Sequence, residues 1–364
     1  MSLNDSTNNH PSDANLHRYG WNDKLDQLKQ ASPYADLPHG RIAIVHRTCY
    51  EVVSSHGVFQ CELAGRMLIE KSADEQPCTG DWITFQPFDN GKGIVVDMLP
   101  RARTLYRKKN GSRTTKQAIA SYVDKAFVVQ SLDGNFNPRR AERFMVQIRE
   151  ADIQPVLVLH KAELEFDQAH VMQAIAHLER QMPILRTSIH QPDSITHLRE
   201  SILPGETAVF VGSSGVGKSS LINALCKSQR VRTSETSRST GKGRHTSTRR
   251  ELVEMDGAGI LIDTPGVREF GLATDAPDTV DGVLDIADFA QSCRFADCSH
   301  QHEPGCAVRE ALDQGLLSAQ VYESYHKLQR EIRHYTASEH EKRRQKKSLT
   351  KLVHDVKKRK DMGR

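Results

Sequence analysis

Hydrophobic and polar residues alternate in short runs between residues 37 and 100, and glycines separate these runs. Five such runs in about sixty residues are typical of a small β-barrel. We expect an OB-fold, with an SH3-like barrel as the competing interpretation. The predicted strands are 41–48, 50–55, 58–63, 81–87 and 93–99.

The pattern changes between about 117 and 275, where apolar, strand-like runs alternate with segments of helical periodicity. Alternation of this kind predicts a parallel sheet covered by helices, the α/β class. The predicted strands are 123–130, 155–160, 183–186, 207–211, 251–255 and 259–262. The predicted helices are 139–150, 167–181, 195–202 and 218–226.

Four further segments complete a multidomain organisation. Residues 1–36 are polar, and we expect a mobile N-terminal arm with a short helix near 23–30. Residues 101–116 form a basic linker between the barrel (37–100) and the α/β domain (117–275). Residues 276–340 are predicted to form a mainly helical domain around a cysteine-rich turn, and 341–364 a basic tail.

Charge is unevenly distributed, although the 364 residues carry a net charge of only +4. The tail holds eleven Lys and Arg against three Asp and Glu, a net charge of +8. Residues 1–340 hold 39 against 43, a net charge of −4. A mildly acidic body with a basic end favours localised contact with RNA phosphates, with a solvated terminal segment as the alternative.

Membrane insertion and export are not expected. No apolar run approaches the roughly 18 residues of a spanning helix, and residues 1–16 lack the hydrophobic stretch of a signal peptide. The seven cysteines, three of them within fourteen residues, fit a metal site in a reducing compartment better than a disulfide framework. We therefore expect a cytoplasmic protein.

Residues 212–219, Gly-Ser-Ser-Gly-Val-Gly-Lys-Ser, match the phosphate-binding pattern GxxxxGK[ST] between an apolar strand and a helical pattern. The glycines let backbone amides surround a phosphate, and the helix N-terminus adds its positive dipole. We expect Lys218 to contact the β- and γ-phosphates and to be catalytic, and the Ser219 hydroxyl to bind Mg²⁺. The expected nucleotide contacts are Gly212, Ser213, Ser214, Gly215, Val216, Gly217, Lys218, Ser219 and Ser220.

A second motif, Asp263-Thr-Pro-Gly266, follows an apolar strand and has the DxxG form that favours a GTPase over a generic ATPase. We expect Asp263 to hold Mg²⁺ through water and the Gly266 amide to sense the γ-phosphate. The polar segment 239–249 has the position of a first switch loop, in which either Thr246 or Thr248 is expected to coordinate Mg²⁺.

The loop that selects the base lies upstream of the phosphate-binding loop. No NKxD-type segment follows Gly266, whereas the strand 155–160 ends in His160 and continues as Lys161, Ala162 and Glu163. The next strand ends in Thr187 and Ser188, which suits the second base-contacting loop. This order predicts a circular permutation, which compact domains tolerate because their termini commonly lie close together. The second switch then leads into the C-terminal domain, so we expect nucleotide state to move that domain.

Three cysteines and a histidine lie within a short segment: Cys293, Cys298, His300 and Cys306. Three thiolates and an imidazole predict a tetrahedral, structural Zn²⁺ site with one ion per chain. His302 is the alternative imidazole.

These motifs together resemble the bacterial ribosome small-subunit-dependent GTPase A family over about residues 37–340. The resemblance is carried by 212–220, by 263–266 with the following 267–270, by the switch segment 243–246 and by the four metal ligands. It implies a cytoplasmic GTPase that binds GTP and GDP, attaches to the 30S ribosomal subunit and its rRNA late in maturation, and is stimulated by the subunit. It also implies hydrolysis-coupled release.

Two positions depart from the family pattern. The family's base loop usually reads Asn-Lys-x-Asp, in which the asparagine braces the loop and meets guanine N7; here His160 and Glu163 replace the asparagine and the aspartate. A weakened contact would cost about 1–3 kcal/mol, so guanine preference could be relaxed. Val267 stands after Gly266 and cannot orient water as glutamine does. The resemblance makes His245 the candidate that positions water, with a surface histidine as the alternative.

The main interpretation is therefore a monomeric GTP-hydrolysing assembly factor for the small subunit. The alternatives are an RNA-binding nucleotide switch with negligible turnover and an RNA-associated P-loop ATPase with relaxed base specificity. Candidate phosphate contacts in the linker are Arg101, Arg103, Arg107, Lys108 and Lys109.

Overall fold

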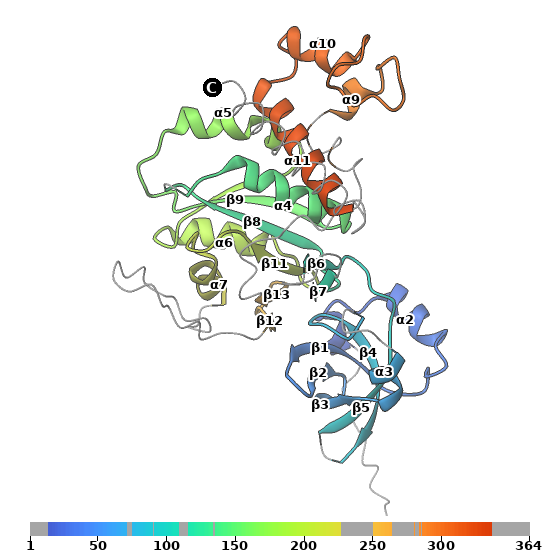
Figure 1. Cartoon of the computed structure of the whole chain (residues 1–364). Coiled ribbons are helices and arrows are strands. Elements are labelled where there is room, and N and C mark those ends of the chain that lie inside the picture. Colours follow the sequence, from blue (N-terminus) through green and yellow to red (C-terminus); the bar gives the residue numbers. More distant parts are fainter. Residues whose placement is uncertain are drawn as a thin grey trace, which may run out of the picture. The chain divides into compact units, whose positions relative to one another are not determined.

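A computed structural model gives the fold for residues 14–70, 75–89, 91–108, 116–133, 135–226, 250–263, 280, 284 and 286–336 (Figure 1). The chain divides into two compact units, residues 1–271 and 272–364. The first unit holds a β-barrel and an α/β sheet, and the second holds the cysteine-rich segment.

Five strands close the barrel: β1 (His39–Val45), β2 (Tyr50–Ser54), β3 (Gly57–Leu63), β4 (Trp82–Phe88) and β5 (Lys92–Met98). They pair in the order β1-β2-β3-β5-β4, and β4 returns to β1 through pairs such as Gly40 with Ile83. A short helix, α3 (Gly65–Glu70), lies between β3 and β4. Alternate residues face inward and form the barrel core, and together with the closed strand order this confirms the predicted five-stranded barrel.

Two N-terminal helices, α1 (Ala14–His17) and α2 (Asp23–Gln30), lie against the barrel. Leu16, Trp21 and Leu25 are buried beside Trp82, and the two indole rings meet edge to face with centroids 4.8 Å apart. The expected mobile arm is therefore wrong for residues 14–36, because three large apolar side chains anchor an otherwise polar segment. Residues 1–13 lie outside the described part of the chain.

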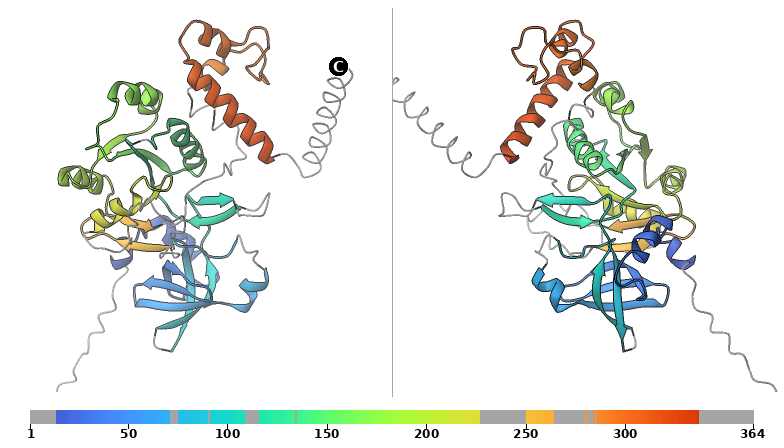
Figure 2. Two further views of the ribbon diagram at one scale, coloured as in Figure 1. Left: turned by 60° about the vertical axis from the view of Figure 1, so that its left-hand side comes forward. Right: turned by 90° about the vertical axis from the view of Figure 1, so that its right-hand side faces the viewer.

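The α/β sheet contains β8 (Lys125–Ser131), β9 (Gln154–His160), β10 (Ile184–Thr187), β11 (Thr207–Val211), β12 (Glu251–Glu254) and β13 (Ile260–Asp263). The strands lie in the order β10-β9-β8-β11-β13-β12, and all neighbouring pairs are parallel except β12 with β13. Two pairs of helices cover opposite faces (Figures 1 and 2), namely α4 (Pro138–Glu150) with α5 (Gln168–Glu179), and α6 (Pro192–Glu200) with α7 (Lys218–Cys226). The predicted helix-covered parallel sheet is confirmed.

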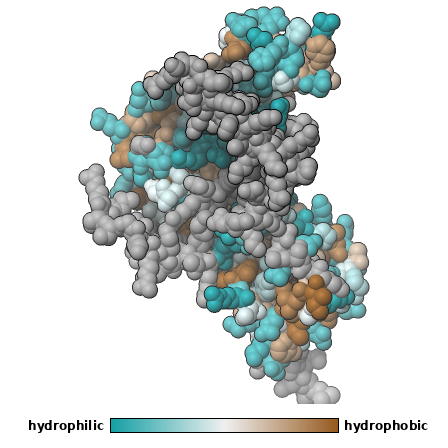
Figure 3. Space-filling model, viewed as in Figure 1, coloured by the Kyte–Doolittle hydropathy of each residue, from teal (hydrophilic) through white to brown (hydrophobic). Residues whose placement is uncertain are grey.

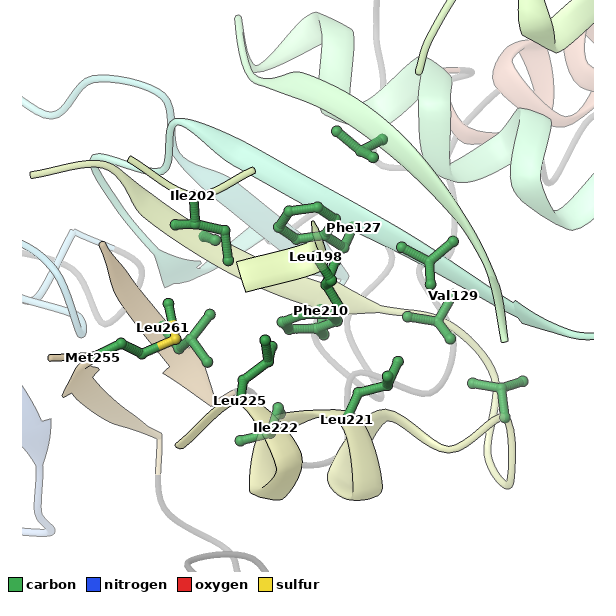
Figure 4. Close-up of a cluster of buried hydrophobic side chains, with 14 residues drawn as sticks. Phe127, Val129, Leu198, Ile202, Phe210, Leu221, Ile222, Leu225, Met255 and Leu261 are labelled. Carbon is green, nitrogen blue, oxygen red and sulfur yellow. The ribbon is translucent and has the colours of Figure 1, made fainter. Parts of the chain in front are cut away.

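The core between the sheet and α6 and α7 fixes the strand–helix pair that carries the phosphate-binding motif (Figure 4). Phe127 of β8 stacks on Phe210 of β11 with ring centroids 5.0 Å apart. Leu221 and Leu225 of α7 are also buried in this cluster. Each such side chain stabilises the packing by roughly 1.5–3 kcal/mol, so the loop between β11 and α7 is held firmly at both ends.

The barrel and the α/β sheet are joined by hydrogen-bonded structure. β1 pairs antiparallel with β12 at Ile44 and Glu251, so that one sheet runs through both. The segment predicted as a linker instead contains part of a hairpin, formed by β6 (Leu105–Lys108) and β7 (Lys116–Ala120).

Arginines of the predicted linker have structural partners. Arg101 binds the fully buried Asp81, with Nη2 2.8 Å from Oδ2. Arg103 pairs with Asp124 at 3.0 Å. The expectation that Arg101 and Arg103 are available as phosphate contacts is therefore not supported by their geometry. Lys109 lies outside the described residues.

Arg41 of β1 is the main polar connection between these parts. Its side chain is buried, and its guanidinium lies over the Trp82 ring, 5.6 Å from the ring centroid. Burial lowers the pKa of Arg41 to about 10, with Asp124 opposing, so the group stays charged at neutral pH. The acceptors of its hydrogen bonds are Tyr19 O, Gly80 O, Ser121 O, Tyr122 O and Thr207 Oγ1.

The second unit contains α9 (Ala287–Ala290), α10 (Ala307–Asp313) and α11 (Ala319–Thr336), and residues 286–336 contain no strand. This confirms the mainly helical character predicted after 275. Among the helices of the described residues, none combines the length and apolar character needed to cross a membrane.

Candidate nucleotide site and metal cluster

The phosphate-binding loop adopts a conformation that depends on glycine. Gly212 and Gly217 have φ of +151° and +98°. A Cβ on Gly212 would lie 2.5 Å from Val129 O, so only glycine lets the loop approach β8 this closely. Lys218 begins α7, and its ammonium donates to Gly212 O at 2.7 Å and Ser213 O at 2.6 Å. The lysine predicted to contact phosphate is thus folded over the loop itself.

A loop that sequence reasoning missed holds the outer side of this motif. Arg140 of α4 donates through Nη1 to Ser213 Oγ at 2.8 Å and to Asn135 Oδ1 at 3.1 Å. Asn135 in turn donates to Ser214 O at 3.2 Å. The position of this loop could have indicated its role, because it follows β8 at the carboxyl edge of the sheet, beside the strand that leads into the phosphate-binding motif.

The predicted base loop lies next to the phosphate-binding loop. Lys161 Nζ donates to Asp133 Oδ2 at 2.7 Å and to Gly215 O at 3.2 Å. Burial alone would raise the pKa of Asp133, but hydrogen bonds from Lys161 and Ser131 outweigh it and lower this pKa to about 2. The carboxylate is therefore ionised at neutral pH and fixes the lysine that joins the two loops.

The second predicted base loop is also brought to this edge. Ala162 N donates to Thr187 O at 3.1 Å, and Thr187 and Ser188 are both buried. Burial alone would raise the pKa of Glu163, but hydrogen bonds from Ser188 and the backbone, together with the nearby His190 and His160, outweigh it and lower this pKa. His190 Nε2 lies 4.0 Å from Glu163 Oε1. The structure therefore brings together the predicted phosphate loop and both predicted base loops.

Asp263 ends β13, opposite Glu251 of β12. Burial and the nearby Glu251 raise the pKa of Asp263 to about 6, although Lys218 opposes this. A bound divalent cation would favour the carboxylate form, so this oxygen donor beside Lys218 is chemically suited to Mg²⁺. His245, Thr246, Thr248 and Gly266 lie outside the described residues.

The predicted metal ligands of the second unit form one cluster. One donor atom from each of Cys293, Cys298, His300 and Cys306 lies within 4.8 Å of the other three. The separation is 4.0 Å between Cys293 Sγ and Cys306 Sγ, and 3.6 Å between Cys293 Sγ and His300 Nδ1. A tetrahedral ion with bonds of about 2.3 Å has ligand separations of about 3.8 Å, so these residues fit such an ion. His302 is exposed and does not belong to the cluster.

The loop around this cluster is organised by hydrogen bonds. The Glu303 carboxylate accepts bonds from Ser299 N and Ser299 Oγ, and from the backbone amides of Gln301 and His302. The Tyr322 hydroxyl of α11 donates to His300 O at 2.6 Å. These contacts hold the ligand loop against the long helix, which is typical of a structural metal site.

The barrel also exposes apolar side chains, visible as brown areas among polar residues in Figure 3. Phe88 and Ile94 are 44% and 39% exposed, and their strands β4 and β5 are hydrogen-bonded neighbours. Val58, Leu68 and Ile69 are further exposed apolar residues of the barrel and its helix. This surface differs from the barrel core, whose apolar side chains are buried or partly buried.

A P-loop between β11 and α7, an aspartate ending β13 and base loops that precede both in the chain define a circularly permuted P-loop GTPase. The RsgA GTPase family model matches residues 98–273, and a model described as 50S ribosome-binding GTPase matches 207–347. A relative that is 63% identical over 95% of the chain, described below, shows that the chain belongs to the RsgA GTPase family. This confirms the resemblance predicted from the sequence and the assignment as a GTP hydrolase.

Individual relatives match over nearly the whole chain. Small ribosomal subunit biogenesis GTPase RsgA 1 of Bacteroides thetaiotaomicron is 63% identical over 346 residues, covering 95% of this chain and 98% of the relative. The RsgA protein of Opitutus terrae is 36% identical, covering 87% and 89%. Among solved structures, YjeQ from Thermotoga maritima matches with a TM-score of 0.61 at 25% identity, covering 81% and 98%. The circularly permuted GTPase YloQ matches with 0.62 at 26%, covering 83% and 97%.

Proposed function

We propose that this chain binds the 30S ribosomal subunit late in its maturation, hydrolyses GTP there under stimulation by the subunit, and leaves when hydrolysis is complete. The observation that carries this proposal is the 63% identity, over 95% of the chain, to a protein named for small-subunit biogenesis. The assembled nucleotide site gives the proposal its chemistry.

In this proposal, residues 212–220 hold the phosphates, with Lys218 neutralising charge that develops between the β- and γ-phosphates. Ser219 and Asp263 hold the Mg²⁺ that accompanies GTP. The base site consists of Lys161, Ala162, Glu163, Thr187 and Ser188. The hydrogen bonds from Lys161 to Asp133 and Gly215 support its place beside the phosphate-binding loop.

The switch residues keep their proposed roles from the sequence. Either Thr246 or Thr248 joins the Mg²⁺ site, and Gly266 senses the γ-phosphate. Val267 stands where other GTPases have a glutamine that orients water, so His245 positions the attacking water instead. A His245→Ala variant with full subunit-stimulated turnover would remove the catalytic role of this histidine.

We further propose that Cys293, Cys298, His300 and Cys306 hold one structural Zn²⁺. The closed set of four protein ligands leaves no open position for substrate, which supports a role in folding rather than in chemistry.

Contact with rRNA is proposed for the exposed apolar face of the barrel and for the basic tail 341–364, whose positive charge would make binding salt-dependent.

We propose a monomer that acts in the cytoplasm, with a barrel over 37–100, a GTPase domain over 117–275 and a zinc domain over 276–340. The permuted order supports movement of the zinc domain with nucleotide state, because the second switch leads directly into it.

The test is GTP turnover by the full chain with and without purified 30S subunits. We expect slow turnover alone, at least tenfold faster turnover with subunits, and none for Lys218→Ala. Equal turnover with and without subunits would contradict the proposal. Competition of ATP against GTP distinguishes the ATPase alternative, which predicts equal affinities, and GTP binding without any turnover would favour the nucleotide-switch alternative.

A further inference from the structure

His160 ends β9 between two strands that lead into other parts of the nucleotide site. It lies opposite Ser131 of β8 and Thr187 of β10 in the sheet register. Only 2% of His160 is exposed, and burial lowers the pKa of its imidazole, with Glu163 opposing. The residue is therefore a neutral ring buried at the carboxyl edge of the sheet.

The ring contacts two separate loops. Nδ1 lies 3.0 Å from Thr187 Oγ1, and Thr187 is fully buried. The edge that carries Cδ2 and Nε2 lies against Gly217, the residue before Lys218. A Cβ built on Gly217 would lie 2.4 Å from Cδ2 and 2.7 Å from Nε2. The imidazole thus fills the space that a side chain at position 217 would need, and the phosphate-binding loop rests on it.

Nδ1 is therefore engaged by Thr187, and Nε2 lies against Gly217. The side chains of Lys161 and Glu163, the second and fourth residues of the base loop, are 29% and 28% exposed. The exposed carboxylate is the group that can accept hydrogen bonds from the N1–H and N2–H₂ edge of guanine. An asparagine at position 160 would be expected both to brace the loop and to meet guanine N7, whereas this histidine is 2% exposed, uses Nδ1 for Thr187 and packs its Nε2 edge against Gly217.

We propose that His160 is a positioning residue that joins the base loop to the phosphate-binding loop through Thr187 and Gly217, and that Glu163 recognises the guanine without a contact from residue 160 to N7. The proposal rests on the GTP-binding function proposed above. It assigns this chain a way of holding its base loop that differs from the Asn-Lys-x-Asp pattern.

The first test uses 7-deaza-GDP, in which a C–H group replaces the N7 acceptor. Its affinity for the full chain is compared with that of GDP by competition against a fluorescent GDP. We expect the wild type to bind both within about twofold, and His160→Asn to prefer GDP by about fivefold or more, because an amide can donate to N7. Wild-type protein that binds 7-deaza-GDP at least fivefold more weakly would overturn the proposal. If neither diphosphate binds, the proposed GTP-binding function fails and the inference fails with it.

The second test addresses the brace itself. His160→Ala and Thr187→Val are each expected to weaken GDP binding about fivefold to tenfold, since each removes the same buried hydrogen bond. The double variant should bind GDP at most twofold more weakly than the single variant with the lower affinity for GDP. His170→Ala on α5, an exposed histidine, is the matched control and should leave affinity unchanged. Additive losses, or no loss in either single variant, would show that the two residues do not act as one brace.

Discussion

Arg41→Met should destabilise the first unit strongly, because Arg41 is the polar connection among the N-terminal segment, the barrel and strand β11. Methionine retains much of the apolar stem but removes the guanidinium. Four backbone carbonyls and Thr207 Oγ1 then lose a donor in a buried environment.

The magnitude follows from two opposing effects. Hydrogen bonds to a charged group contribute about 1.5–3 kcal/mol each, but the variant also avoids the cost of burying a charge. Removing one member of a buried charged network costs about 3–5 kcal/mol, and we expect a loss in that range. The stability of Arg41→Lys should lie between that of Arg41→Met and that of the wild type, since an ammonium has three donors but lacks the planar fork of the guanidinium.

The assay is urea unfolding followed by tryptophan fluorescence. The chain has two tryptophans, Trp21 and Trp82, and both are buried around Arg41. Their signal therefore reports on this region rather than on the second unit. Arg47→Met, at an exposed arginine just after β1, is the matched control and should change stability by less than about 0.5 kcal/mol. A loss below about 1 kcal/mol for Arg41→Met would refute the reasoning.

Three other predictions concern the sites. Metal analysis of the purified chain should find one Zn²⁺, and a chelator or Cys298→Ser should lower the melting temperature of the second unit; retention of that temperature without metal would contradict a structural role. Because folding raises the pKa of Asp263 from 3.8 to about 6, its contribution to the stability of nucleotide-free protein is present below about pH 4 and lost as pH rises to 6. The unfolding free energy of the wild type should therefore decrease between about pH 4 and pH 6, and Asp263→Asn should remove this decrease; a variant with the same pH profile as the wild type would oppose this. Arg140→Ala and Ser213→Ala should each weaken GDP binding about threefold to tenfold without adding in the double variant, whereas additive losses would mean that their hydrogen bond does not position the loop.

Local patterns were sufficient to predict most elements of the fold. The five barrel strands and the six strands of the α/β sheet follow from short-range alternation and apolar runs, and the phosphate loop follows from a motif whose glycines meet a backbone requirement. The four metal ligands are close in sequence, so their spacing alone indicated a common site.

Long-range contacts could not be predicted in the same way. Leu16, Trp21 and Leu25 lie in a polar segment, and only the barrel surface explains their burial. The pairing of β1 with β12 joins positions about two hundred residues apart, and no periodicity encodes it. Arg41 has the sequence context of an ordinary strand residue, although its acceptors come from four distant segments.

His160 illustrates the difference between identity and placement. From the sequence, a histidine in place of asparagine indicated a weaker base contact. In the fold, the ring is buried between Thr187 and Gly217, so the substitution changes how the loop is held. Pairing of His160 with Thr187 across β9 and β10 required the sheet register, which sequence reasoning did not supply.

The central claim is that the small ribosomal subunit activates GTP hydrolysis by this chain. Single-turnover hydrolysis should be measured with purified 30S subunits, with purified 50S subunits and with neither, because one matching family model is described as 50S ribosome-binding. The account predicts at least tenfold acceleration by 30S subunits and less than twofold by 50S subunits. Equal acceleration by both, or acceleration by 50S subunits alone, would contradict it.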